Sequence, residues 1–115
     1  MSFYSARLLF IFLTEGDVPK KRNFYEESVI VFRAKDRRCA FERALELGRS
    51  REREHLDDRG RRARWVLKTV VNLDWVGSRI DGKEVASYLH YGVGKTKIDP
   101  NTLFYPERSE PSESF

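Results

Sequence analysis

The first third of the chain carries the hydrophobic pattern of two β-strands. Residues 3–13 begin with alternating apolar and polar positions and end as a run that is apolar at both parities. Such a run is typical of a strand that is covered on both faces. Residues 24–34 are again rich in β-branched and aromatic side chains, whereas residues 14–23 hold Gly16, Pro19 and three consecutive basic residues. We therefore expect an antiparallel hairpin whose loop spans 14–23.

The pattern changes to a helical period after Asp36, a residue type that favours the N-cap position. Apolar positions then recur at helical spacing as far as Gly48, and charged residues occupy the opposite face. Residues 49–58 are almost entirely charged, so we expect a break or a weak helix there. Residues 57–64 indicate a turn centred on Gly60.

Residues 63–76 show the most regular alternation in the chain. Alternate positions from Ala63 to Trp75 share one parity, which predicts a strand with both of its tryptophans in the core. A later Asp-Gly dipeptide predicts a turn, and residues 84–91 predict a short last strand.

Together these elements predict an α+β fold in the order strand, strand, helix, strand, strand. The expected architecture is a four-stranded, mainly antiparallel sheet with one amphipathic helix on one face. A chain of 115 residues is long enough for one such domain. We assign residues 1–97 to it, and we expect residues 98–115, which are rich in proline and serine and slightly acidic, to form a flexible tail.

The apolar run at the end of the first strand predicts a second covered face. One helix covers only one face of a sheet, so the other needs a second copy, a different protein, or the segment around Leu103, Phe104 and Tyr105. We favour a protein–protein interface, because aromatic and large aliphatic side chains dominate such contacts. The residues that we expect in it are Leu9, Ile11, Leu13, Tyr25, Tyr88 and Tyr91.

Positive charge suggests a different partner. The formal net charge is +4, and the residues that could contact nucleic acid or an acidic protein are Lys20, Lys21, Arg22, Arg59, Arg61, Arg62 and Arg64. Four acids interleave with the arginines, so residues 49–64 carry only +3 (seven arginines minus four acids), and no stacking aromatic lies among them. A solvated, salt-bridged surface is the commoner origin of such a run. Nucleic-acid binding therefore stays the alternative.

No catalytic or cofactor motif emerges from the sequence. The glycine-rich stretch 92–96 lacks the first glycine of a phosphate loop, because Leu89 stands there, and Pro100 follows where a helix is needed. We expect Cys39 to be a buried structural thiol on the helix. Neither His55 nor His90 has a partner at catalytic spacing. We therefore expect no enzyme activity and no cofactor.

Counts of special residues restrict the class of protein further. One cysteine excludes an intramolecular disulfide framework, and two histidines make a zinc site improbable. The longest apolar run, residues 8–13, is far shorter than the roughly 18 residues of a membrane span. We expect a cytoplasmic protein without a membrane segment or a bound metal.

Several short phrases are similar to those of a bacterial domain-of-unknown-function family of small α+β proteins. They occur in the same order in this chain: YSARLLF at 4–10, YEESVIVFRA at 25–34, Ala40-x-x-x-Ala44-x-x-x-Gly48, Trp65-Val66 and DGKEVAS at 81–87. The resemblance covers most of residues 3–90. It implies a bacterial, cytoplasmic origin and the same order of elements, but it supplies no activity, cofactor or site residue.

These observations favour a non-enzymatic interaction module that docks through an apolar sheet face or edge. Its partner is another protein or a second copy of itself. By analogy with other small bacterial proteins that lack an active site, an accessory, inhibitor or immunity-type role suits it.

Overall fold

The computed structural model describes residues 1–16, 24–87, 89 and 98–112. Its elements, in chain order, are β1 (Ser2–Thr14), β2 (Phe24–Ala34), α1 (Arg37–Ser50), β3 (Arg53–Leu56), β4 (Arg62–Gly77) and the short 3-10 helix η1 (Pro106–Arg108). The strands form one antiparallel sheet in the order β2-β1-β4-β3. The α+β class and the order strand, strand, helix, strand, strand are confirmed.

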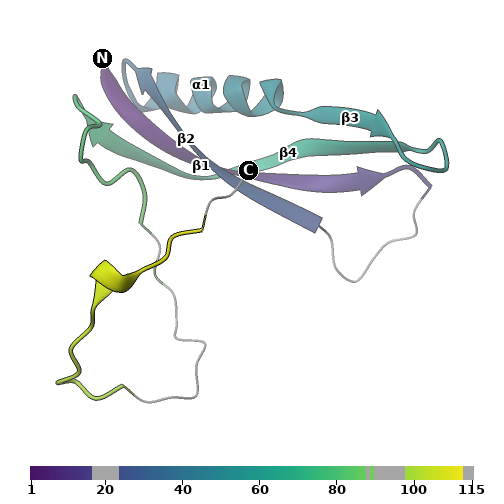
Figure 1. The fold of residues 1–115 in the computed structure, drawn as a ribbon. Coiled ribbons are helices and arrows are strands. Elements are labelled where there is room, and N and C mark those ends of the chain that lie inside the picture. The colour runs from purple at the N-terminus through teal and green to yellow at the C-terminus, as the bar shows by residue number, and fades with distance from the viewer. Residues whose placement is uncertain (17–23, 88, 90–97, 113–115) are drawn as a thin grey trace.

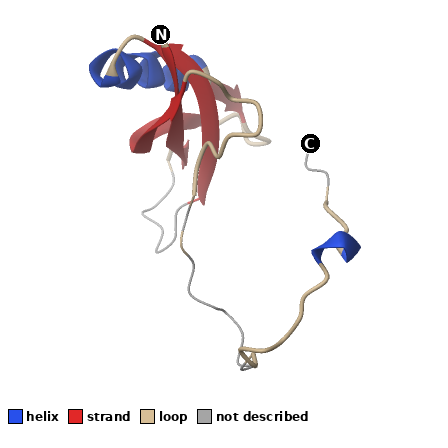
Figure 2. Cartoon of the chain, turned by 90° about the vertical axis from the view of Figure 1, so that its left-hand side faces the viewer, coloured by secondary structure: helices blue, strands red, loops and turns tan. Residues whose placement is uncertain are grey.

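The helix lies against one face of the sheet and covers only part of it. Figure 1 shows α1 above one half of β1, β2 and β4, with β3 continuing along the other half. Figure 2 shows the same helix on one side of the strands. We call the face that α1 contacts the helix face, and the opposite one the far face.

The helix begins and ends where its sequence favours it. The Asp36 side chain accepts a hydrogen bond from the backbone N–H of Cys39 at 2.8 Å, which satisfies one of the free donors of the first turn. The buried side of α1 consists of Ala40, Ala44 and Gly48. These small residues allow a close approach to the sheet: a Cβ on Gly48 would lie 2.8 Å from Leu67 Cδ2.

The hydrophobic core lies between α1 and the helix face. It is built from alternate residues of β1 and β2 and from the small residues of the helix. Its buried members are Tyr4, Ala6, Leu8, Phe10, Ile30, Phe32, Ala34, Ala40 and Ala44, and Leu47, Trp65, Leu67, Val70 and Leu73 pack against them.

The expected regular alternation of β4 is wrong in its middle. Leu9 pairs with Thr69 and Phe10 with Leu67, so Lys68 is an extra residue, and a second shift leaves Val71 unpaired. Each extra residue is a bulge that reverses which parity faces the core. Thr69 consequently lies on the far face opposite Leu9, and Val70 packs against the core instead.

The second expected core tryptophan is also wrong. Trp65 packs against the core, but Trp75 is 65% exposed. Trp75 lies at the end of β4, just before a third register shift, and its ring lies beside Gly77 rather than under the helix.

The identity of the fourth strand differs from the prediction. Residues 84–87 and 89 are not part of a strand, and residues 88, 90 and 91 lie outside the described ranges. The missing partner of β4 is instead β3, in the charged stretch where we expected a break or a weak helix. All four β3 residues are exposed, so this edge strand lacks the apolar pattern by which a strand is usually identified.

Candidate interaction surfaces

The far face carries an apolar stripe along three adjacent strands. Leu9, Ile11 and Leu13 of β1 are half-buried in its centre. Tyr25 of β2 and Val66 of β4 lie on either side of Ile11, and Val29 and Val31 lie farther along β2, opposite Arg7 and Ser5. Tyr25, Val29 and Val31 are 42%, 44% and 40% exposed. We call these seven apolar residues the far-face stripe. It contains four of the six interface residues that the sequence predicted; the other two, Tyr88 and Tyr91, lie outside the described residues.

Charged residues cross the far-face stripe at the level of Leu9. The guanidinium group of Arg7 on β1 donates bidentate hydrogen bonds to the carboxylate of Glu27 on β2, with N···O distances of 2.7 to 2.9 Å. On the β4 side, the ammonium group of Lys68 lies 5.1 Å from the centre of the Tyr25 ring. The acidic group therefore lies on the β2 side of the stripe and a basic group comes from the β4 side.

Only one end of the far face is covered by the described residues. The Ser5 hydroxyl donates a hydrogen bond to the carbonyl of Val85, and Ser5 is 1% exposed. The apolar residues of the C-terminal segment do not supply more cover, since Leu103, Phe104 and Tyr105 are 78%, 68% and 54% exposed. The segment that could have completed the sheet does not pack on the stripe in this structure.

The outer edge of β4 is protected by side chains. β3 pairs only with residues 62–65, which leaves the rest of that edge without a neighbouring strand in the described part of the chain. Arg37 donates to the carbonyl of Leu73 at 2.9 Å, and Glu52 accepts from the backbone N–H of Leu67 at 2.9 Å. Charged side chains on an edge strand reduce its tendency to pair with another strand.

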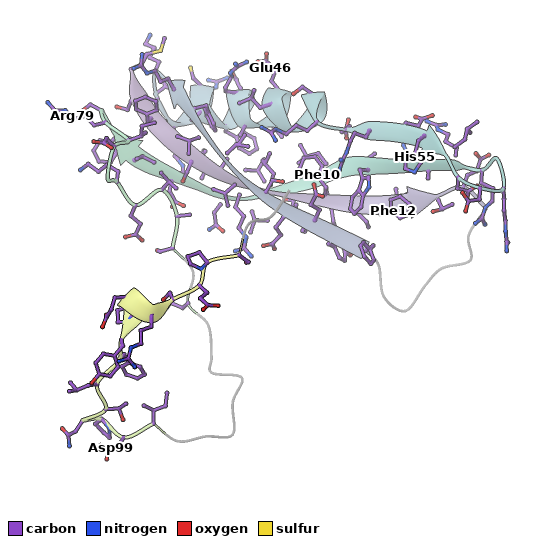
Figure 3. The ribbon with its side chains drawn as sticks, in the orientation of Figure 1. Phe10, Phe12, Glu46, His55, Arg79 and Asp99 are labelled. Carbon is purple, nitrogen blue, oxygen red and sulfur yellow. The ribbon has the colours of Figure 1, made fainter. Side chains whose placement is uncertain are left out.

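A second surface, which sequence analysis missed, lies on the helix face beyond the end of α1. The ring of Phe12 contacts Trp65, with 5.1 Å between centroids, and lies 6.4 Å from the ring of His55. Phe24 is 6.3 Å from Trp65 at the other side, and Arg53 lies 5.9 Å above Trp65. Figure 3 shows Phe12 and His55 past the helix end. We call these five residues the aromatic platform.

A hollow of about 340 Å³ adjoins the aromatic platform at the C-terminal end of α1. Its walls combine an aromatic ring with hydroxyls and charged groups: Phe10, Glu26, Ser28, Ser50, Arg51 and Arg53. The four rings of the platform come from four strands, so no local motif could have shown them together. The only available signal was that Phe12 and Phe24 flank the same predicted hairpin loop.

The arginine-rich stretch is partly neutralised by its own acids. The Asp57 carboxylate accepts from the backbone N–H groups of Arg59 and Arg61 and from the Arg61 guanidinium, at 2.8 to 2.9 Å. The hydrogen bond from the Arg61 backbone is the main reason that the pKa of Asp57 lies below its ordinary value. Arg62 pairs with Glu54 at 2.7 Å.

The seven predicted nucleic-acid contact residues therefore differ in how they are held. Arg61 and Arg62 are held within the β3–β4 hairpin, whereas Arg59 and Arg64 make no side-chain hydrogen bond or ion pair with the residues that the structure describes. The remaining three, Lys20, Lys21 and Arg22, lie outside those residues.

The expectation of a buried thiol is wrong. Cys39 is exposed, because it is one position away from the buried side of α1 that begins at Ala40. A side-chain hydrogen bond to the Asp36 carboxylate raises the pKa of the Cys39 thiol, which favours the unreactive protonated form at neutral pH. Among the described residues, no group of three or more His, Cys, Asp or Glu side chains could hold a metal ion. None of their helices has the length and apolar character of a membrane span.

Comparisons with known proteins identify the family but no function. No curated protein and no solved structure matches the chain. Residues 3–87 match the family described as Domain of unknown function (DUF4288), which covers β1 to β4 and α1. The chain therefore belongs to this family.

Proposed function

We propose that this protein is a non-enzymatic interaction module whose far face binds the far face of a second copy. The observation that supports this proposal is the far-face stripe, in which three strands present seven apolar residues and the described chain covers only the Ser5 end. Contiguous apolar patches on soluble monomers are usually small, and larger ones mark contact sites. Two sheets that pack face to face form a stable core between their inner faces.

The positions of the charges favour a particular arrangement of the two copies. A two-fold axis that runs parallel to the strands, between the sheets, places β2 of one copy against β4 of the other. Glu27 lies at the level of Leu9, and Lys68 is the extra residue of β4 between the partners of Leu9 and Phe10, so each Glu27 then lies near the Lys68 of the partner copy. The same operation brings Tyr25 against Val66, since both lie at the level of Ile11. A two-fold axis perpendicular to the strands would instead place β2 of one copy on β2 of the other. Neither the Glu27–Lys68 contact nor the Tyr25–Val66 contact would then form.

The face is a better candidate than the edge of the sheet. At the outer edge of β4, Arg37 and Glu52 already bond backbone groups that an added strand would need. On the far face, Leu9, Ile11 and Leu13 are only half-buried, and the Lys68 side chain reaches across this part of β1 toward Tyr25. In the bacterial cytoplasm that the family resemblance implies, such a pair would act as an accessory protein rather than as a catalyst.

The test is the variant Ile11→Arg, compared with Leu103→Arg as a matched control. Ile11 lies at the centre of the stripe, and Leu103 is a more exposed leucine in the C-terminal segment. Sedimentation equilibrium of the wild type is expected to show a dimer, and Ile11→Arg a monomer with an unchanged circular dichroism spectrum. Leu103→Arg is expected to remain dimeric.

Three outcomes would contradict the proposal. A wild type that is monomeric at tens of micromolar would exclude the second copy as occupant. An Ile11→Arg variant that is unfolded would place Ile11 in the core. If instead Leu103→Arg abolished association as fully as Ile11→Arg, the occupant would be the C-terminal segment and not the sheet face.

A further inference from the structure

Several arginines near the aromatic platform are not paired with the acids of the same stretch. Three of the four acids in residues 49–64 are bonded within the chain: Glu52 to the Leu67 backbone, Glu54 to Arg62, and Asp57 to the 57–61 turn. By contrast, the side chains of Arg49 and Arg51 bond to no described residue. Residues 49–64 keep their net charge of +3, and part of that excess lies on the exposed residues Arg49 and Arg51.

The same region presents an exposed phenylalanine and a half-buried tryptophan beside those arginines. Phe24 is 72% exposed, and its ring lies near Trp65, which Arg53 approaches from the other side. Arg53 also lies 3.6 Å from Glu26, a long contact that leaves most of its hydrogen-bonding groups free for another acceptor. Because α1 ends at Ser50, it does not extend over the rings.

We propose that the aromatic platform binds single-stranded nucleic acid. Unpaired bases stack on aromatic side chains, and the phosphates between them are neutralised by arginines along the path. Here Phe24 and Trp65 offer the stacking surface, and Arg51 and Arg53, which line the adjoining hollow, offer the phosphate contacts. Duplexes fit less well, because their bases are already stacked on each other. The platform lies on the helix face, so this proposal is independent of the far-face dimer.

The experiment measures fluorescence anisotropy of a labelled 12-nucleotide single strand, as RNA and as DNA, titrated with the full chain at 50 mM salt. Phe24→Ala is expected to weaken binding about tenfold, the usual effect of losing one stacked base. Arg51→Gln is expected to weaken binding. It should also make the slope of log binding constant against log salt concentration shallower by about 0.7, which is the contribution of one phosphate contact on a single strand.

Matched control variants distinguish binding at the aromatic platform from attraction to the overall positive charge or to any exposed aromatic side chain. Arg79 is an exposed arginine near the opposite end of the molecule (Figure 3), and Phe104 is an exposed phenylalanine of the C-terminal segment. Arg79→Gln and Phe104→Ala are expected to bind as tightly as the wild type. Ile11→Arg is also expected to bind normally, which distinguishes failure of the dimer from failure of this site.

The proposal is overturned by any of four results. The first is the absence of binding to either single strand at 50 mM salt. The second is Phe24→Ala binding with unchanged affinity. The third is an equal loss in Arg51→Gln and Arg79→Gln, which would show attraction to the overall charge and no local site. Tighter binding to the matched duplex would also contradict base stacking.

Discussion

The two faces of the sheet come from the same strands but meet different surroundings. Leu8 on the helix face is completely buried under α1, whereas its neighbour Leu9 on the far face is only half-buried. Ala40, Ala44 and Gly48 let the helix approach the first face closely. The second face has apolar residues of similar size but no helix. One part of the apolar pattern of β1 therefore builds the core under the helix, and the other part stays half-exposed on the far face.

The largest effect is expected for a matched pair of truncations on β1. Leu8→Ala removes a fully buried side chain, so we expect a loss of about 2–5 kcal/mol in the free energy of unfolding. Leu9→Ala should lower the stability of the monomer by less and should weaken association instead. Urea titrations of both variants, followed by circular dichroism at a concentration below dimerisation, measure the difference. Equal losses would show that the two faces are equally part of the core.

A smaller effect is expected where α1 meets the sheet. A Cβ at Gly48 would meet the Leu67 side chain at 2.8 Å, so Gly48→Ala should destabilise the fold by about 1 kcal/mol, even though alanine favours the helix. In a Leu67→Ala background the contact is gone, and the same substitution should become neutral or stabilising. A double-mutant cycle by urea unfolding checks this. A constant effect in both backgrounds would argue against close contact between helix and sheet.

The smallest effect is expected in the hairpin that extends the helix face beyond α1. The fold lowers the pKa of Asp57 from its ordinary value of 3.8. The carboxylate charge therefore stabilises the turn at pH values above 3.8, and this contribution is lost as the pH falls through the lowered pKa. Asp57→Asn should therefore lower the melting temperature slightly at pH 7. The difference from the wild type should shrink below about pH 4. Thermal melts at both pH values test this, and a difference that grew in acid would contradict the assigned charge.

Elements with a strong local pattern were predictable, and those defined by pairing were not. The alternation at the start of β1, the β-branched and aromatic content of β2, the Asp36 cap and the period of α1 are local signals, and the structure has the elements that they predict. β3 is exposed at every position, so only its pairing with Arg62–Trp65 makes it a strand. The bulges at Lys68 and Val71 depend on the register against β1, which alternation within β4 cannot show.

Of the two candidate surfaces, one could also be predicted from a local pattern and the other could not. Leu9, Ile11, Leu13 and Tyr25 could be predicted, because an apolar residue on the face without a helix is visible in the period-2 pattern. The aromatic platform could not, because the rings of Phe12, Phe24, His55 and Trp65 come from different strands. Likewise, composition does not show that the Glu52 carboxylate accepts a hydrogen bond from the backbone of β4.

The most direct test of the far-face dimer is a mixing experiment with two charge-reversal variants. In Glu27→Lys and in Lys68→Glu alone, every Glu27–Lys68 contact across the proposed interface becomes repulsive, so each should be a folded monomer. In an equimolar mixture the two contacts are restored between unlike copies, and native mass spectrometry should find a heterodimer that neither variant forms with itself. The far-face dimer is contradicted if both variants dimerise as well as the wild type. It is also contradicted if both variants are folded and their mixture contains only monomers.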